Sequence, residues 1–196
     1  MNKIKDEELV LGTEPEAKAL TITLEEKSHN AGERAYMAEG RKEVRVLHKT
    51  PVNYRDEKTG EYKHKDNRLI KADGVYRNIA GSKTVELPDS TDDYRIKIND
   101  GNTSVSWRYL GSKSNKTYKK SGRKLKSPEV SCKKEDIYIN ENETSEELGE
   151  TESAALYKNI EKGVDLEYVV SNNCLKENII VREKKEKYDF CFELET

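Results

Sequence analysis

The sequence is poor in the residues that build large hydrophobic cores and membrane spans. Only 33% of its 196 residues are hydrophobic, and it contains no long apolar run. Its first residues lack the apolar stretch of a signal peptide, so the sequence predicts neither a membrane-spanning segment nor an export signal. Charged residues make up 38% of the chain, yet they nearly cancel to a net charge of -2, unlike the large net charge of many disordered proteins. We therefore expect a folded but very polar chain of one domain or two small ones.

Metal and cofactor motifs are also missing. The cysteines, Cys132, Cys174 and Cys191, are far apart without C-x-x-C spacing, and the three histidines are isolated from any nucleophile pattern. The chain contains no G-x-G-x-x-G, no Walker A loop, no H-E-x-x-H and no G-x-S-x-G. The sequence thus predicts no cofactor and no metal site, and leaves open one disulfide with a thiol left over.

Two stretches concentrate charge of one sign. Residues 111–126 carry lysine and arginine without an acidic residue, and residues 141–152 carry glutamate without a cation. Nucleic acid or an anionic wall polymer would suit the basic stretch, but Tyr118 is its single aromatic residue and the chain is nearly neutral overall. We therefore expect solvated loops in both places and do not predict nucleic-acid binding.

Alternation of polar and apolar residues with period two is the main structural signal. It recurs in short segments separated by Gly, Asn, Asp or Pro, a pattern typical of antiparallel β proteins. The expected strands are Leu20–Leu24, Val44–Leu47, Val52–Tyr54, Glu61–His64, Thr84–Leu87, Tyr94–Asn99, Thr103–Leu110, Ile137–Ile139, Val164–Val170, Leu175–Val181 and Tyr188–Leu194. Two packed sheets need an apolar residue only at every second strand position. The sequence therefore predicts an all-β fold, either an antiparallel β-sandwich-like domain or two packed small β subdomains, with a charged variable loop.

Two hairpins are expected within this pattern. Asp100-Gly101 separates Tyr94–Asn99 from Thr103–Leu110, and this dipeptide readily supplies the positive φ angles of a tight turn. Residues 171–174 separate Val164–Val170 from Leu175–Val181, which would form the second hairpin.

The chain divides into four expected parts. Residues 1–19 read as a flexible leader or short helix, and residues 20–111 as an N-terminal β subdomain. Residues 112–153 read as a charged linker or loop, and residues 154–196 as a C-terminal β-hairpin region that packs on the first subdomain.

Asp165 and Glu167 are the nearest thing to a pair of catalytic carboxylates. They lie two residues apart on one expected strand and therefore share a face. Such a pair serves glycoside hydrolysis only where the face lines a cleft. Val164, Leu166 and Tyr168 would point the other way into a core, so we expect the two carboxylates to face water and not to be catalytic.

Residues 154–181 resemble a segment of large bacterial surface proteins. In one-letter code they read AALYKNIEKGVDLEYVVSNNCLKENIIV. The segment is similar to the region that precedes the YD repeats of RHS-type, wall-associated proteins and polymorphic toxins. The positions that carry this resemblance are Tyr157, Gly163, Asp165, Leu166, Tyr168, Lys176, Glu177 and Ile179.

A second block, residues 51–70, resembles another part of the same family region. Tyr62 stands where the family commonly has a tryptophan, and Asp66-Asn67 matches its D-N pair. Tyr54 and Tyr62 would bracket a surface hairpin turn at Asp56–Gly60. With a looser match over residues 74–111, the resemblance covers roughly residues 20–196.

The resemblance implies a noncatalytic β-rich module of a secreted or cell-surface assembly. Its partners would be other domains of a larger surface protein or a cell-wall polymer, and its motif residues would be structural. Family members usually carry an export signal upstream and long repeats downstream. This chain shows neither, which leaves a cytoplasmic location open as the alternative.

Two other functions remain as alternatives. A carbohydrate- or cell-wall-binding sandwich could stack sugars on Trp107, Tyr109, Tyr54 and Tyr62. Trp107 shares a strand face with Val105 and Tyr109, however, so burial in the core is favoured over exposure. The more remote alternative is a glycoside hydrolase-like enzyme that uses Asp165 and Glu167.

Overall fold

The computed structural model describes residues 18–19, 32–36, 44–89, 95–111, 126–140, 143–145 and 148–196, and every regular element in these ranges is a β-strand. The strands are β1 (Lys18–Ala19), β2 (Glu33–Tyr36), β3 (Val44–Leu47), β4 (Asn53–Arg55), β5 (Tyr62–His64), β6 (Asp66–Ala72), β7 (Val75–Ala80), β8 (Thr84–Pro88), β9 (Ile96–Asp100), β10 (Thr103–Gly111), β11 (Glu129–Lys134), β12 (Ile137–Asn140), β13 (Glu143–Ser145), β14 (Thr151–Glu161), β15 (Val164–Val170), β16 (Leu175–Val181) and β17 (Cys191–Glu195).

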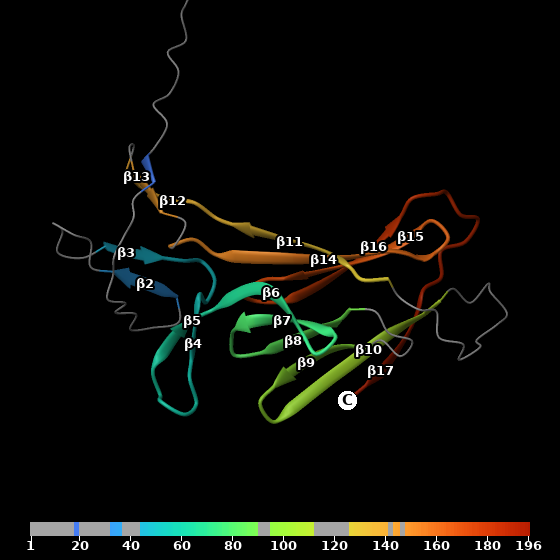
Figure 1. Cartoon of the computed structure of the whole chain (residues 1–196), viewed down its shortest axis with the longest axis horizontal. Coiled ribbons are helices and arrows are strands. Elements are labelled where there is room, and N and C mark those ends of the chain that lie inside the picture. The colour runs from blue at the N-terminus through green and yellow to red at the C-terminus, as the bar shows by residue number, and fades with distance from the viewer. Residues whose placement is uncertain are drawn as a thin grey trace, which may run out of the picture.

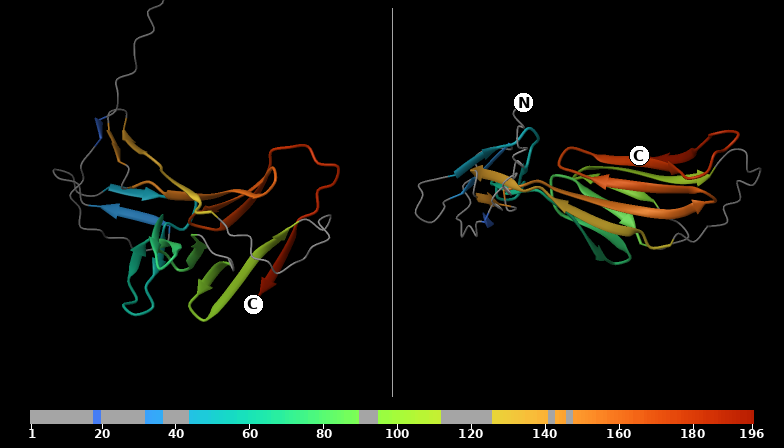
Figure 2. Two further views of the ribbon diagram at one scale, coloured as in Figure 1. Left: turned by 45° about the vertical axis from the view of Figure 1, so that its right-hand side comes forward. Right: turned by 90° about the horizontal axis from the view of Figure 1, so that it is seen from above.

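Two antiparallel sheets form the body of the molecule. The six-stranded sheet has the order β17-β10-β9-β8-β7-β6, and the four-stranded sheet has the order β11-β14-β15-β16. Figure 1 shows the four-stranded sheet lying over the six-stranded one, and Figure 2 shows the same sheets in an oblique view and from above. The predicted all-β, antiparallel sandwich-like fold is confirmed.

The core lies between the inner faces of these two sheets, the faces that each sheet turns toward the other. Both sheets contribute their alternate residues to one buried cluster, as expected for strands with period-two alternation. The buried members are Val85, Leu87, Ile96, Tyr109, Ala155, Tyr157, Ile160, Val164, Leu166, Tyr168 and Val170. The apolar residues, although few, are thus concentrated in one layer.

Both predicted hairpins are confirmed. Strands β9 and β10 pair from Thr103↔Asp100 onward, and Gly101 has the positive φ of 56° that a tight turn needs. Strands β15 and β16 pair over the whole predicted length, from Val164↔Val181 to Val170↔Leu175.

The last strand joins the C-terminal part of the chain to the N-terminal part. After β16 the chain leaves the four-stranded sheet, and β17 pairs antiparallel with β10 in the six-stranded sheet, with Leu194 opposite Trp107. The expected parts 20–111 and 154–196 therefore share a sheet as well as a core.

Three small sheets lie at one end of the sandwich, on the left in Figure 1. They are the hairpins β2–β3 and β4–β5 and the three-stranded sheet β1-β13-β12, in which β1 and β13 pair in parallel. Of the expected leader 1–19, only residues 18–19 fall within the described residues, where they form β1. The expected strand Leu20–Leu24 and the basic stretch over residues 112–125 lie outside them.

The expected linker 112–153 contains strands. β11, β12, β13 and the first residues of β14 fall within it. β11 pairs with β14 at the edge of the four-stranded sheet, and all six of its residues are exposed. An edge strand exposed on both faces needs no alternation of apolar and polar residues, because backbone hydrogen bonds hold it. Its sequence therefore reads as a loop.

Gly149 is expected to tolerate no side chain. A Cβ at this position would overlap the carbonyl oxygen of Glu135, and the neighbouring backbone is held by a 3.0 Å hydrogen bond from Glu135 N to Glu150 O. We predict that Gly149→Ala lowers the free energy of unfolding by about 2 kcal/mol or more, measured by denaturant unfolding. Gly74→Asn is the control, because its positive φ of 77° suits asparagine and no heavy atom lies within 4 Å of the added Cβ. Equal stability of the two variants would contradict the prediction.

Among the described residues, no helix is long and apolar enough to cross a membrane.

Candidate functional site

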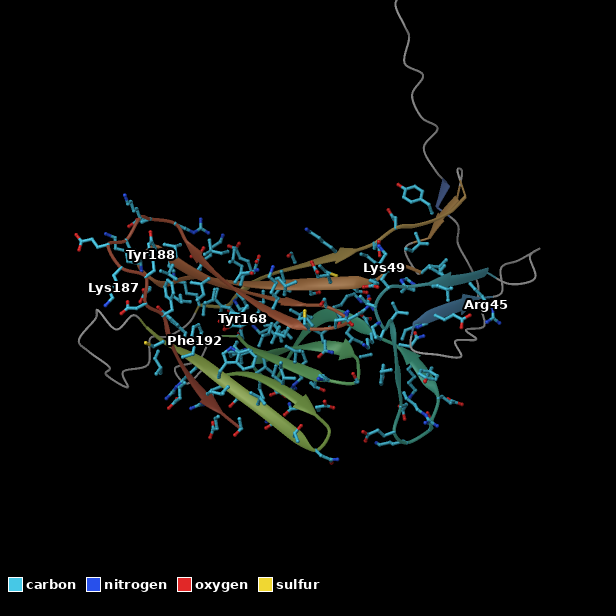
Figure 3. All side chains as sticks on the ribbon, turned by 180° about the vertical axis from the view of Figure 1, so that it is seen from behind. Arg45, Lys49, Tyr168, Lys187, Tyr188 and Phe192 are labelled. Carbon is cyan, nitrogen blue, oxygen red and sulfur yellow. The ribbon has the colours of Figure 1, made fainter. Side chains whose placement is uncertain are left out.

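The four aromatic residues considered for sugar stacking do not form one surface. Trp107 and Tyr109 lie on the inner face of β10, where Tyr109 is buried and Trp107 half-buried. Tyr109 packs against Phe192 of β17, with ring centroids 5.3 Å apart. Phe192 is labelled in Figure 3.

Tyr54 and Tyr62 lie in a different sheet and on opposite faces of it. In the β4–β5 hairpin, Tyr54 pairs with Lys63 and Tyr62 pairs with Arg55. Paired residues share a face and successive residues alternate, so the two tyrosines point in opposite directions. The turn between them is held by Asp56, whose carboxylate accepts hydrogen bonds from Lys58 N, Thr59 N and Lys63 Nζ.

Glu177 joins the two layers. It lies on the inner face of β16, and its Oε2 accepts hydrogen bonds from Tyr168 OH at 2.5 Å and from Trp107 Nε1 at 2.9 Å. Tyr168 belongs to the same sheet as Glu177, whereas Trp107 belongs to the other. Burial, reinforced by the hydrogen bond to Glu177, raises the pKa of Tyr168 above its ordinary value, so the hydroxyl remains a proton donor. Figure 3 shows Tyr168 between the two layers.

Tyr157 makes a second polar link between the sheets. Its hydroxyl donates a 2.7 Å hydrogen bond to the carbonyl oxygen of Pro88 at the end of β8. Its ring meets Tyr168 edge-on, with centroids 6.0 Å apart and planes at 80°. A buried tyrosine hydroxyl needs such a partner, and this one fixes where β14 lies over the six-stranded sheet.

Asp165 does not face water, contrary to the sequence-based expectation. The Asp165 side chain is fully buried, although it points to the outer face of β15, away from the core. Arg182 Nε donates a 2.6 Å hydrogen bond to Oδ2, and the backbone N–H of Asn159 donates one of 2.8 Å to Oδ1. Asn159 has a positive φ of 53° in a bulge of β14, so Asp165 holds both the bulge and the segment after β16.

Glu167 has a different environment from Asp165. It is half-buried, and its Oε2 accepts a 2.8 Å hydrogen bond from Asn178 Nδ2 on the neighbouring strand. The two carboxylates share a face as predicted, but each is held by a structural partner. Asp165 is bound by Arg182 and the Asn159 N–H, and Glu167 by Asn178.

Asn67, in the second family-like block, also serves as a link between sheets. It is buried in β6, and its Nδ2 donates to Thr151 O at 2.8 Å and to Asn172 Oδ1 at 2.6 Å. Its neighbour Asp66 pairs with Arg68 on the same strand at the surface. Both members of the D-N pair therefore have defined structural contacts.

The remaining motif positions lie around the β15–β16 hairpin. Gly163 turns the chain between β14 and β15 with a φ of 70°, directly beneath the side chain of Glu183. Lys176 is exposed on the outer face of β16.

Sequence reasoning missed Arg182, Lys185 and Asn172. Arg182 and Lys185 lie in the segment that crosses from β16 to β17, and Lys185 Nζ bonds the buried Glu161 at 2.9 Å. The signal for Arg182 was present, because the predicted hairpin places Ile180 opposite Asp165 and Arg182 diagonal to it. No local pattern marked the other two.

Within the described part of the chain, no group of three or more His, Cys, Asp or Glu side chains could hold a metal ion. Cys132, Cys174 and Cys191 form no disulfide with one another, and Cys132 and Cys174 are exposed.

Comparison of the chain with family models, with curated proteins and with solved structures finds no match in any of the three.

Proposed function

We propose that this chain is a noncatalytic structural or binding module of an RHS-like bacterial cell-surface or toxin-delivery protein. One observation carries the proposal: the motif positions that resemble the family take part in holding the sandwich together. Tyr157 and Glu177 link the two sheets, and Asp165 holds the bulge of β14. Such contacts are what a scaffold module requires of its recurrent polar residues.

The hydrolase alternative receives less support. Its two carboxylates bond Arg182 and Asn178, and the guanidinium and the Asn159 N–H outweigh the effect of burial and lower the pKa of Asp165. A general acid needs a raised pKa. The carbohydrate-binding alternative is weakened by the burial of Tyr109 and by the opposite directions of Tyr54 and Tyr62.

The proposal is tested in the bacterium that encodes the chain. An antibody raised against the chain should label intact cells as strongly as permeabilised ones, and the full reading frame should contain YD repeats in frame with residues 1–196. Labelling confined to permeabilised cells, together with a reading frame without repeats, would contradict the proposal.

A further inference from the structure

The four-stranded sheet leaves part of the six-stranded sheet uncovered. Glu177 of β16, the last strand of the upper layer, stands over Trp107 of β10. Leu194 of β17 is the cross-strand neighbour of Trp107 and lies one strand farther out. Leu194 is 66% exposed and Val105, also on the inner face of β10, is 38% exposed. The described strands therefore leave an inner-face row of the sandwich open beside β16.

The edge of β16 that adjoins this row carries unpaired backbone groups. Within the described residues, β16 pairs only with β15. The hydrogen bonds from Ser171 N to Cys174 O and from Arg182 N to Gly163 O mark the two ends of the ladder. Antiparallel pairs alternate between bonded and non-bonded, so every second residue of β16 turns its N–H and C=O away from β15. These residues are Leu175, Glu177, Ile179 and Val181.

We propose that β16 accepts an additional β-strand from a neighbouring domain, whose inward side chains cover Leu194, Val105 and the open side of Trp107. The inference rests on the proposed function, because a module of a larger surface protein has neighbouring domains to supply the strand. A strand added to the free edge of β16 would lie opposite β17, directly over the uncovered row. It would extend the four-stranded sheet to five strands above the six below.

The chemistry of the site selects the occupant. The edge of β16 presents backbone donors and acceptors at every second residue. The uncovered row of the six-stranded sheet presents apolar side chains at the same spacing. Together they fit an extended peptide with an apolar residue at every second position. Lys176 is exposed on the outer face of the same strand. An acidic residue in the outward row of the partner would pair with it across the strands.

The test uses the full chain and two sets of synthetic ten-residue peptides. One set has valine or isoleucine at every second position and glutamate among the others, and the second set has the same compositions in shuffled order. Trp107 is the only tryptophan and reports directly from the site. We expect saturable binding of the alternating set, a blue shift of Trp107 emission, and no binding of the shuffled set.

Amide hydrogen exchange distinguishes strand addition from other binding. On addition of the alternating peptides, the amides of Leu175, Glu177, Ile179 and Val181 should exchange about tenfold more slowly. The amides of Lys176, Asn178 and Ile180 already bond β15 and should change little. Equal slowing of both groups would overturn the proposal.

Two matched variants complete the experiment. Leu194→Lys should weaken peptide binding about tenfold, because it places a charge in the apolar row. Leu47→Lys replaces a similarly exposed leucine, 80% exposed on β3, and should leave binding unchanged. Both residues are exposed, so both variants should keep the thermal midpoint of the parent chain.

Three results would overturn the inference: no binding of the alternating set at millimolar concentration, equal binding of the shuffled set, or dimerisation of the free chain that protects the same four amides. The last result would make a second copy the occupant. None of them bears on the antibody labelling or the reading frame, which test the proposed function separately.

Discussion

Glu177→Leu is expected to lower the free energy of unfolding by about 3 kcal/mol. The substitution removes the acceptor shared by Tyr168 OH and Trp107 Nε1 and leaves both donors without it between the sheets. A buried donor that loses its partner costs about 1–3 kcal/mol, and Tyr168 is buried whereas Trp107 is half-buried. Glu177→Gln keeps a carbonyl oxygen as acceptor and should lose about 1 kcal/mol, since the charge assistance is gone.

Denaturant unfolding followed by circular dichroism measures this effect. Glu167→Leu is the matched control, because Glu167 lies on the neighbouring strand but faces outward, where among the described residues its side chain bonds Asn178. It should cost less than about 1 kcal/mol. If Glu177→Leu proves as stable as the parent chain, Glu177 does not join the layers.

Asp165→Asn is expected to cost about 2–3 kcal/mol. The carboxylate is fully buried and accepts hydrogen bonds from Arg182 and from the Asn159 backbone. Hydrogen bonds to a charged group are worth about 1.5–3 kcal/mol. The asparagine amide keeps one acceptor oxygen. It can therefore accept a hydrogen bond from the Asn159 N–H or from the Arg182 guanidinium, but not from both with full strength. Arg182 is half-exposed and recovers part of its loss from water.

The stability that Asp165 contributes should depend on pH. Burial acts to raise its pKa, but Arg182 and the Asn159 N–H together lower the pKa below its ordinary value of 3.8. A carboxyl whose pKa is lower in the folded chain stabilises it above the unfolded pKa, and this contribution is lost as the pH falls toward the folded pKa. The stability difference between the parent chain and Asp165→Asn should therefore be constant above about pH 5 and shrink below pH 4.

The measurement is the difference between the two unfolding curves at each pH. Asp56, Asp66 and Asp89 also have lowered pKa values and destabilise both proteins alike in acid. Subtracting one unfolding free energy from the other at each pH therefore cancels the contribution of these three carboxylates. A difference that does not change between pH 7 and pH 3 would show that the ionised form of Asp165 has no structural role.

The sequence was most informative where strands and turns are local. Asp100-Gly101 identified the β9–β10 hairpin, and alternation over residues 164–181 identified the strands β15 and β16. At Asp100-Gly101 the turn dipeptide and the alternation of the flanking segments agree, and a shift of one residue in either strand would turn its apolar residues outward.

The sequence was less informative where a contact joins distant segments. Period two assigns Asp165 to the outer face, but it does not reveal that a bulge at Asn159 and the side chain of Arg182 cover that position. Alternation indicated a strand over residues 188–194, yet β17 pairs with β10 across 80 or more residues, and this pairing has no local signal. No local pattern revealed that Glu177 accepts hydrogen bonds from Tyr168 and from Trp107 of the other sheet.

The link between the layers is tested most directly by a double-mutant cycle across them, with Trp107→Phe in β10 and Glu177→Leu in β16. The two residues meet through the 2.9 Å hydrogen bond and lie on different sheets. If the family-like motif residues hold the sheets together, the free energies of unfolding of the four proteins should give a coupling of about 1 kcal/mol or more. A coupling within error of zero would mean that the two substitutions act independently, and would contradict the role of Glu177 as the link between the layers.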